Sequence, residues 1–208
     1  MCARKIVNTL GATNIAKSIR EDLDFYQTPS GATSALVKSG LLDKNTTIWE
    51  PMAGNGAIVE VLKQNGYSVV CSDIVERKYK LDFVDDFFVG VRSMQMMQSN
   101  WQIVTNPPYN MVDRFLQHCL SMVPSFLAVF LPVRYLEGMK RFKDIYSKYV
   151  PSDVIVFAQR YGCYKELDKE SGIVTDRGVG SAIAYMWLCF KKKEDGSYGN
   201  ETKLHFAF

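Results

Sequence analysis

Short runs of apolar residues alternate along this chain with stretches whose apolar residues recur at helical spacing. The apolar runs predict buried strands at residues 46–49, 68–72, within 81–87, 101–104, 126–131, 154–157 and 182–190. The helical spacing predicts helices at residues 32–41, 58–64, around 94–97 and 112–122. Because strands and helices alternate, the pattern predicts an α/β fold with a mostly parallel sheet.

Length and composition fit one domain with a complete core. The chain has 208 residues, of which 47% are hydrophobic and 23% are charged. We expect residues 24–190 to form this domain and residues 1–23 to form an N-terminal arm or helix. Residues 191–208 are expected to form a C-terminal tail that packs on the same domain.

Charge and cysteine usage narrow the class of protein only a little. The net charge of +3 is compatible with a nucleic-acid partner without indicating one. Five scattered cysteines without a C-x-x-C pair favour a reduced, cytoplasmic protein. His118 and His205 are too far apart in the sequence to suggest a metal site. The richest apolar run stops at Pro132 and is too short to span a membrane, so we expect no membrane partner and no metal.

A proline-rich loop follows the predicted strand at 101–104. Its sequence is Asn106-Pro107-Pro108-Tyr109, and the two prolines cannot extend a strand because they lack an amide hydrogen. The loop therefore opens at the carboxyl edge of the sheet, where α/β folds bind ligands. An amide oxygen of Asn106 and the carbonyl of Pro107 could accept the two protons of an aromatic amine, and Tyr109 could stack on its ring. The alternative is a stiff loop with no chemistry.

A glycine turn joins the first predicted strand to the next helix. Gly54 and Gly56 allow the backbone to approach a ligand closely, and Glu50 can accept a hydrogen bond from an ammonium group. Asp73 ends the second predicted strand, at the position where a ribose is commonly held. Upstream, Asp-Phe-Tyr-Gln-Thr-Pro (residues 24–29) places two aromatic residues before a helix. They could embrace a ligand or cap the core.

These three motifs, in this order, resemble small adenine-N6 DNA methyltransferases of phages and bacteria that use S-adenosyl-L-methionine. The resemblance implies a Rossmann-like class I methyltransferase fold, with a mostly parallel seven-stranded sheet, helices on both faces and an antiparallel last strand. It also implies that adenine leaves the DNA helix before it reacts, since its N6 is inaccessible inside a duplex. The expected cofactor is S-adenosyl-L-methionine and the expected partner is DNA, with RNA as an alternative.

The resemblance assigns roles to residues of this chain. The implied catalytic residues are Asn106, Pro107, Pro108 and Tyr109. The implied cofactor-binding residues are Phe25, Tyr26, Thr28, Pro29, Glu50, Pro51, Ala53, Gly54, Gly56, Asp73, Ile74, Asp86, Phe87 and Asn106. Asp85 remains an alternative to Asp86, and both could simply belong to a solvated acidic turn.

Two regions are candidates for substrate binding, together with Tyr109. Arg134 follows the fifth predicted strand and lies near the expected catalytic edge. The long connection 159–180 carries basic and aromatic residues that could contact nucleic acid, namely Arg160, Tyr161, Tyr164, Lys165, Lys169 and Arg177. A mobile surface hairpin is the alternative there, and a solvated amphipathic helix is the preferred interpretation of the basic residues at 140–148.

Other activities share parts of this pattern. Asn-Pro-Pro-Tyr also occurs in methyltransferases for RNA adenine, cytosine N4 and protein glutamine, although the segment 24–29 argues against glutamine. A non-catalytic nucleic-acid-binding module on the same fold is a further alternative. At this length we expect no separate target-recognition domain, so the resemblance implies no particular target sequence.

Overall fold

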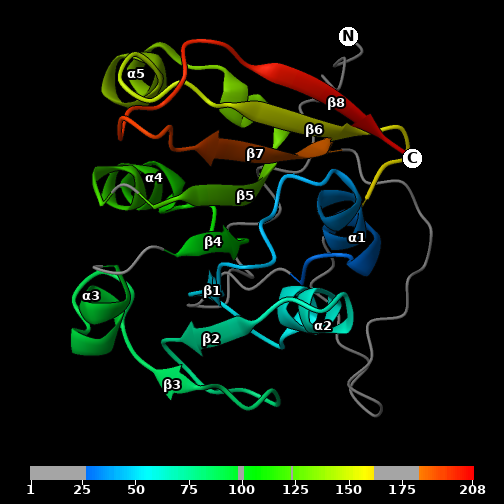
Figure 1. The fold of residues 1–208 in the computed structure, drawn as a ribbon, viewed down its shortest axis with the longest axis vertical. Coiled ribbons are helices and arrows are strands. Elements are labelled where there is room, and N and C mark those ends of the chain that lie inside the picture. Colours follow the sequence, from blue (N-terminus) through cyan, green and yellow to red (C-terminus); the bar gives the residue numbers. More distant parts are fainter. Residues whose placement is uncertain (1–26, 98–100, 123, 162–182) are drawn as a thin grey trace, which may run out of the picture.

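An eight-stranded sheet with helices on both faces forms the protein (Figure 1), as seen in a computed structural model that describes residues 27–97, 101–122, 124–161 and 183–208. The strands are β1 (Ile48–Glu50), β2 (Val69–Asp73), β3 (Phe83–Val84), β4 (Gln102–Thr105), β5 (Phe126–Pro132), β6 (Asp153–Phe157), β7 (Tyr185–Lys191) and β8 (Lys203–Ala207). The helices are α1 (Ser30–Lys38), α2 (Ala57–Gln64), α3 (Val91–Met97), α4 (Val112–Ser121) and α5 (Met139–Arg141). A 3₁₀ turn η2 (Val133–Leu136) precedes α5 and a π-helix η3 (Phe142–Tyr146) follows it.

The strand order β3-β2-β1-β4-β5-β7-β6-β8 confirms the predicted Rossmann-like class. β1 to β5 pair in parallel, and β7 runs antiparallel to both β5 and β6. The carboxyl ends of β1, β2, β4 and β5 therefore meet at one edge of the sheet. The direction in which the chain winds reverses between β1 and β4, which is where such sheets bind ligands.

The sheet has one strand more than the seven predicted. The extra strand, β8, comes from the segment after Lys191 and pairs in parallel with β6. Its apolar residues are few and mostly exposed, with Leu204 at 56% and Phe206 at 70% of their full accessibility. Because so short a stretch buries little apolar surface, its pattern did not specify a pairing partner.

Two apolar layers hold the helices to the sheet. β5 is buried along its whole length, and its residues alternate between the two layers. Leu127, Val129 and Leu131 pack with α4, whereas Phe126, Ala128 and Phe130 belong to the layer that contains α1 and α2. Figure 1 shows this division, with α1 and α2 on one face and α3, α4 and α5 on the other. Among the described helices, none has the length and apolar character needed to cross a bilayer.

A buried hydrogen bond fixes α1 to strand β7. The indole nitrogen of Trp187, on β7, donates to the carbonyl of Ala32 at 2.7 Å, and both residues are fully buried. This contact places the residues just before α1 over the carboxyl edge of the sheet. Gln27 and Thr28 consequently reach the same edge as the loops after β1, β2 and β4.

Candidate functional site

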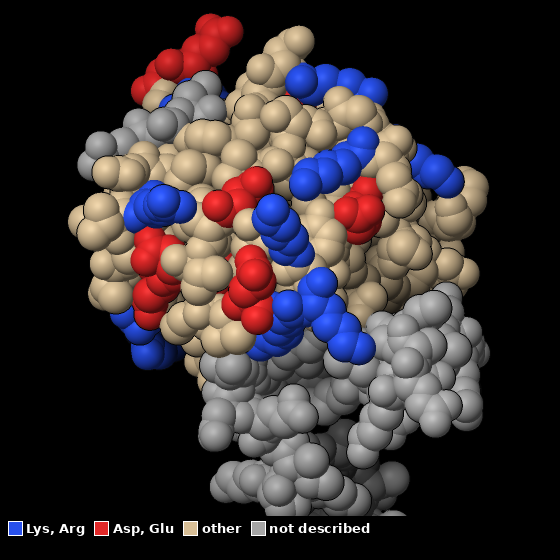
Figure 2. All heavy atoms as spheres, turned by 90° about the horizontal axis from the view of Figure 1, so that it is seen from below, with Lys and Arg blue, Asp and Glu red and all other residues tan. Residues whose placement is uncertain are grey.

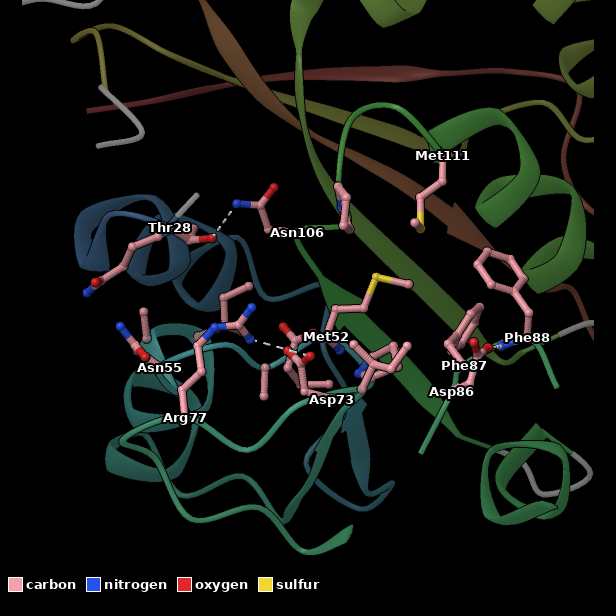
Figure 3. A pocket seen from close by; sticks show the side chains of 18 of the residues that line it. Thr28, Met52, Asn55, Asp73, Arg77, Asp86, Phe87, Phe88, Asn106 and Met111 are labelled. Atoms are coloured by element: carbon pink, nitrogen blue, oxygen red, sulfur yellow. Dashed lines mark hydrogen bonds and ion pairs between the residues drawn. The ribbon is translucent and has the colours of Figure 1, made fainter. Parts of the chain in front are cut away.

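A pocket opens at the carboxyl edge of β1, β2 and β4 (Figure 3). Five segments line it: the residues before α1, the turn after β1, the end of β2, the loop after β3 and the loop after β4. Its lining residues are Gln27, Thr28, Glu50, Pro51, Met52, Ala53, Asn55, Ala57, Ile58, Asp73, Ile74, Arg77, Asp86, Phe87, Phe88, Asn106, Pro108, Asn110 and Met111. In Figure 3, Thr28 and Asn106 lie toward one end and Asp86, Phe87 and Phe88 toward the other, with Asp73 between them.

The turn after β1 depends on glycine. Gly56 immediately precedes α2 with φ of 79°, a left-handed conformation that side chains other than glycine rarely adopt. A Cβ there would also collide with the ring of Tyr79. Gly54, with φ of 55°, turns its amide toward Asp73. The two glycines thereby allow the sharp turn that joins β1 to α2 beside the pocket.

Glu50 places a carboxyl group on the pocket wall with almost no access to water. Its side chain is 1% exposed, and Oε1 accepts the amide hydrogen of Met52 at 3.0 Å. In the described part of the chain, Oε2 has no hydrogen-bond partner. Burial raises the pKa of Glu50 to about 8, and the nearby Asp73 acts in the same direction, whereas the neighbouring Thr105 hydroxyl and the Met52 amide oppose the rise. A buried acceptor of this kind suits a ligand that brings a positive charge.

Asp73 at the end of β2 holds the glycine turn in place. Oδ2 accepts the amide hydrogen of Gly54 at 2.8 Å, and Oδ1 accepts that of Val75 at 3.3 Å. Arg77 adds an ion pair to Oδ1 at 3.5 Å and lines the pocket itself. A diol that bound to the Asp73 carboxylate would share it with the amides of Gly54 and Val75 and with the guanidinium group of Arg77.

The loop after β3 contributes one of the two acidic residues considered from the sequence. Asp86 lines the pocket, and its Oδ1 accepts the amide hydrogen of Phe88 at 2.7 Å. Asp85 instead accepts the amide hydrogen of Ser93, in α3, at 3.0 Å. Phe87 lines the pocket from the core side, where its ring lies 5.5 Å from that of Trp49.

Asn106 is held from outside its own loop. Its Nδ2 donates to the hydroxyl of Thr28 at 3.0 Å, across 78 residues of sequence (Figure 3). Thr28 is 3% exposed, so the bond is shielded from water. The bond to Thr28 thereby fixes the orientation of the Asn106 amide group at the edge of the pocket.

Tyr109 is held through its backbone. The hydroxyl of Tyr135 donates to the carbonyl of Tyr109 at 2.7 Å. The ring of Tyr109 is half-buried, 6.4 Å from the ring of Tyr135 and 6.3 Å from that of Tyr185. Together with the Asn106 contact, this bond fixes both ends of the Asn-Pro-Pro-Tyr loop.

Several residues singled out from the sequence lie away from the pocket wall. Pro29, Gly54, Gly56, Pro107 and Tyr109 belong to the loops around the pocket without lining it, and Arg134, Arg160 and Tyr161 do not line it either. Tyr161 packs edge-on against Phe157 at 4.8 Å and touches α1 at Gly31. Phe25, Tyr26, Tyr164, Lys165, Lys169 and Arg177 fall outside the described residues.

Other lining residues were missing from the sequence interpretation. Gln27, Met52 and Asn55 lie inside the recognised motifs, so their position within those motifs could have indicated that they line the pocket. Phe88 followed the acidic-aromatic pair. Arg77 and Met111 lie in irregular or loop-adjacent positions for which no pattern indicated a role. Within residues 27–97, 101–122, 124–161 and 183–208, no group of three His, Cys, Asp or Glu is placed to hold a metal ion.

Comparisons with known proteins identify the fold. No protein-family model matches the sequence, and a search of curated proteins finds no match. Among solved structures, a predicted O-methyltransferase from Agrobacterium tumefaciens aligns with a TM-score of 0.52 and 12% identity, over 86% of this chain and 85% of that one. The M protein of the type I restriction enzyme EcoKI aligns with a TM-score of 0.57 and 14% identity, over 85% of this chain and 46% of that one.

A third structure widens the range of substrates among the neighbours. It is a candidate RNA methyltransferase from Pyrococcus horikoshii, with a TM-score of 0.53 and 16% identity, over 82% of this chain and 87% of that one. The chain thus spans about half the length of the EcoKI M protein and most of the other two. At these identities the likeness establishes the methyltransferase fold, which is the fold that the motifs implied.

Proposed function

We propose that this protein transfers a methyl group from S-adenosyl-L-methionine to the N6 amino group of adenine in DNA. The observation that carries the proposal is one pocket that joins a buried, partly unsatisfied Glu50 carboxyl group to the amide of Asn106. The first suits a cationic cofactor and the second suits an aromatic amine. The restriction-enzyme M protein among the structural neighbours supports DNA as the acceptor.

The residues of the pocket fit this cofactor. Glu50 would accept from its ammonium group, and Asp73 would accept from its ribose hydroxyls while keeping the Gly54 amide. Ile74, which is 51% exposed at the pocket, and Phe87 would flank its adenine. Bound S-adenosyl-L-methionine would supply a methyl group activated by a positively charged sulfur. The amine nitrogen would bond to the methyl carbon in line with the breaking carbon–sulfur bond, whose electrons would stay on sulfur, and the nitrogen would release one proton to solvent.

The loop after β4 would prepare the amine for that displacement. An aromatic amine is a poor nucleophile because its lone pair is delocalised into the ring. The amide oxygen of Asn106 and the carbonyl of Pro107 would accept its two hydrogens and favour a tetrahedral nitrogen with a localised lone pair. Thr28 keeps the Asn106 amide in the required orientation through the 3.0 Å bond. Tyr109 would stack on the flipped base after a local movement of its ring.

RNA adenine is the second candidate acceptor, because one structural neighbour is a candidate RNA methyltransferase. Labelled cofactor should be offered in parallel to plasmid DNA from a methylation-free host, to unmodified RNA and to total protein. We expect label in DNA, recovered as N6-methyladenine. Label confined to RNA, to protein or to cytosine would refute the DNA-adenine assignment, and absence of cofactor binding by calorimetry would refute the enzyme assignment itself.

A further inference from the structure

β5 extends beyond the carboxyl end of its neighbour β4. Thr105, the last residue of β4, lies opposite Val129, yet β5 continues to Pro132. At roughly 3.3 Å per residue, β5 ends about 10 Å beyond the point where the Asn106 loop opens. Residues 133–146, which form η2, α5 and η3, are called the rim below.

The rim exposes large apolar side chains. Leu136 is 42% exposed, Met139 is 70% exposed and Phe142 is 57% exposed. Met139 and Phe142 are three residues apart in continuous helical structure, so they project from the same side. Exposed apolar residues also occur in segments 84–94 and 204–208, so the feature that distinguishes the rim is its position next to the catalytic loop.

Exposed basic residues accompany the apolar ones. Arg134, Lys140 and Lys143 are all exposed on the rim. Arg141, by contrast, is engaged in the structure, because it pairs with Asp113 at 2.6 Å and donates to the carbonyl of Glu137 at 2.6 Å. Figure 2 shows the opposite end of the molecule, where basic and acidic side chains are interspersed. With Glu137 and Asp144 as its two acidic residues against four basic ones, the rim combines apolar side chains with a net positive charge, which suits a polyanion with an apolar interior.

Hydrogen bonds connect the rim to the catalytic loop. The hydroxyl of Tyr135 reaches the carbonyl of Tyr109 at 2.7 Å, and the hydroxyl of Tyr146 reaches the carbonyl of Tyr135 at 2.6 Å. A ligand that sits on the rim is consequently held in a fixed position relative to Asn106. The π-helix at Phe142–Tyr146 is a form of helix frequently found at functional sites.

We propose that the rim is a duplex-DNA surface on which Met139 and Phe142 insert between base pairs beside the extruded adenine, while Arg134, Lys140 and Lys143 contact phosphates. The inference rests on the DNA methyltransferase function proposed above. Extrusion of a base leaves a gap in the stack, and apolar side chains that enter the duplex compensate for the lost stacking. Basic residues on either side hold the backbone in register.

The test compares duplex and single-stranded DNA of the same sequence as methyl acceptors. The variant Met139→Ala/Phe142→Ala should lose about tenfold or more in kcat/KM on the duplex, as expected for lost stacking contacts. It should lose less than about threefold on the single strand, where no base must be extruded. The matched control is Met94→Ala/Phe206→Ala, which removes the same residue types at 51% and 70% exposure on α3 and β8. This control should match the wild type on both acceptors.

Binding measurements separate this inference from the proposed function. For Lys140→Ala/Lys143→Ala, the salt dependence of duplex affinity should flatten by roughly two units of slope, one for each lost phosphate contact. Methylation of duplex by the Met139/Phe142 variant at the control rate, or equal losses on both acceptors, would overturn the inference and leave the enzyme assignment intact. Duplex binding that weakens in the lysine variant without any methyl transfer by the wild type would overturn the enzyme assignment alone. A wild-type protein that binds no duplex would overturn the DNA surface.

Discussion

The two halves of the catalytic edge differ in how deeply their charged side chains are buried. In the half formed by β1 and β2, Glu50 is 1% exposed and Asp73 is 8% exposed. Each of their carboxylates accepts a hydrogen bond from a backbone amide. In the half that follows β5, the rim exposes Met139 at 70%, and Arg134, Lys140 and Lys143 are exposed on the same segment. A small charged ligand gains affinity from a desolvated site that is already formed, whereas a long polyanion needs an exposed surface. Asn106 lies where the two halves meet.

Asn106→Ala should produce the largest effect, since it removes the group that links the two halves. We expect kcat to fall by about 100-fold to 1000-fold, as for the loss of one group that stabilises a transition state. Affinity for S-adenosylmethionine should change less than about twofold, because the interaction is made in the reaction step. Single-turnover kinetics and calorimetry measure the two quantities. Asn110→Ala, which alters another asparagine of the same pocket, is the control.

Glu50→Gln should separate cofactor binding from stability within the buried half. The loss of a charge-assisted hydrogen bond should weaken cofactor binding by about 1.5–3 kcal/mol. The free protein should behave differently, because burial raises the pKa of Glu50 from 4.5 to about 8. Below pH 4.5 both the folded and unfolded states hold this proton. As the pH rises toward 8, the unfolded state releases the proton first, so the buried carboxyl costs more and more stability.

Chemical denaturation at several pH values tests this second effect. The free energy of unfolding of Glu50→Gln should exceed that of the wild type at pH 8, by an amount on the order of a few kcal/mol. The difference should shrink as the pH falls toward 4.5. A variant that loses stability equally at pH 5 and pH 8 would show that Glu50 serves the fold rather than the ligand.

Thr28→Val should have an intermediate effect that tests the positioning of Asn106. The substitution keeps the shape of the side chain but removes the hydroxyl that accepts from Asn106. We expect kcat to fall by about tenfold, since a misoriented catalytic group spends less time in the reactive geometry. Thr28→Ser restores a hydroxyl and should recover most of this loss. Equal activity of the valine and serine variants would remove Thr28 from the orientation of Asn106.

Asp73→Asn should give the smallest effect of the series. The amide side chain keeps an oxygen for the Gly54 amide but loses the charge that pairs with Arg77. We expect cofactor affinity to fall by about 0.5–1.5 kcal/mol, the value of one hydrogen bond to a ribose hydroxyl. Calorimetry with S-adenosylmethionine and with a 2′-deoxy analogue should show that most of this loss disappears for the analogue. A loss of the same size for both ligands would argue against a ribose contact at Asp73.

The sequence predicted the fold through local patterns that act over a few residues. The apolar run at 126–131 matches β5 (Phe126–Pro132), and the amphipathic run at 112–122 matches α4 (Val112–Ser121). The C-terminal tail was expected to pack on the domain, but the pairing of β8 with β6 was not foreseen, because Leu204 and Phe206 bury too little surface to specify a partner. Central strands and core helices were therefore predictable, and the edge strand was not.

In the pocket, the sequence likewise predicted residues next to strands but not the contacts between distant segments. Glu50 and Asp73 could be singled out because each follows a recognisable strand. Thr28, predicted as a cofactor contact, lines the pocket, and its hydroxyl also accepts from Asn106 across 78 residues, a pairing that only the packing of α1 reveals. Tyr135 gave no signal either, because its bond to the carbonyl of Tyr109 depends on how far β5 extends beyond β4.

Nucleoside analysis of DNA from a methylation-free host that expresses this protein tests the central claim most directly. The chromosomal DNA would be digested to nucleosides and examined by mass spectrometry, with Asn106→Ala expressed to the same level as the control. We predict N6-methyldeoxyadenosine in the wild-type sample and its absence in the control. Wild-type DNA without N6-methyldeoxyadenosine, or equal amounts of it in both samples, would contradict the account.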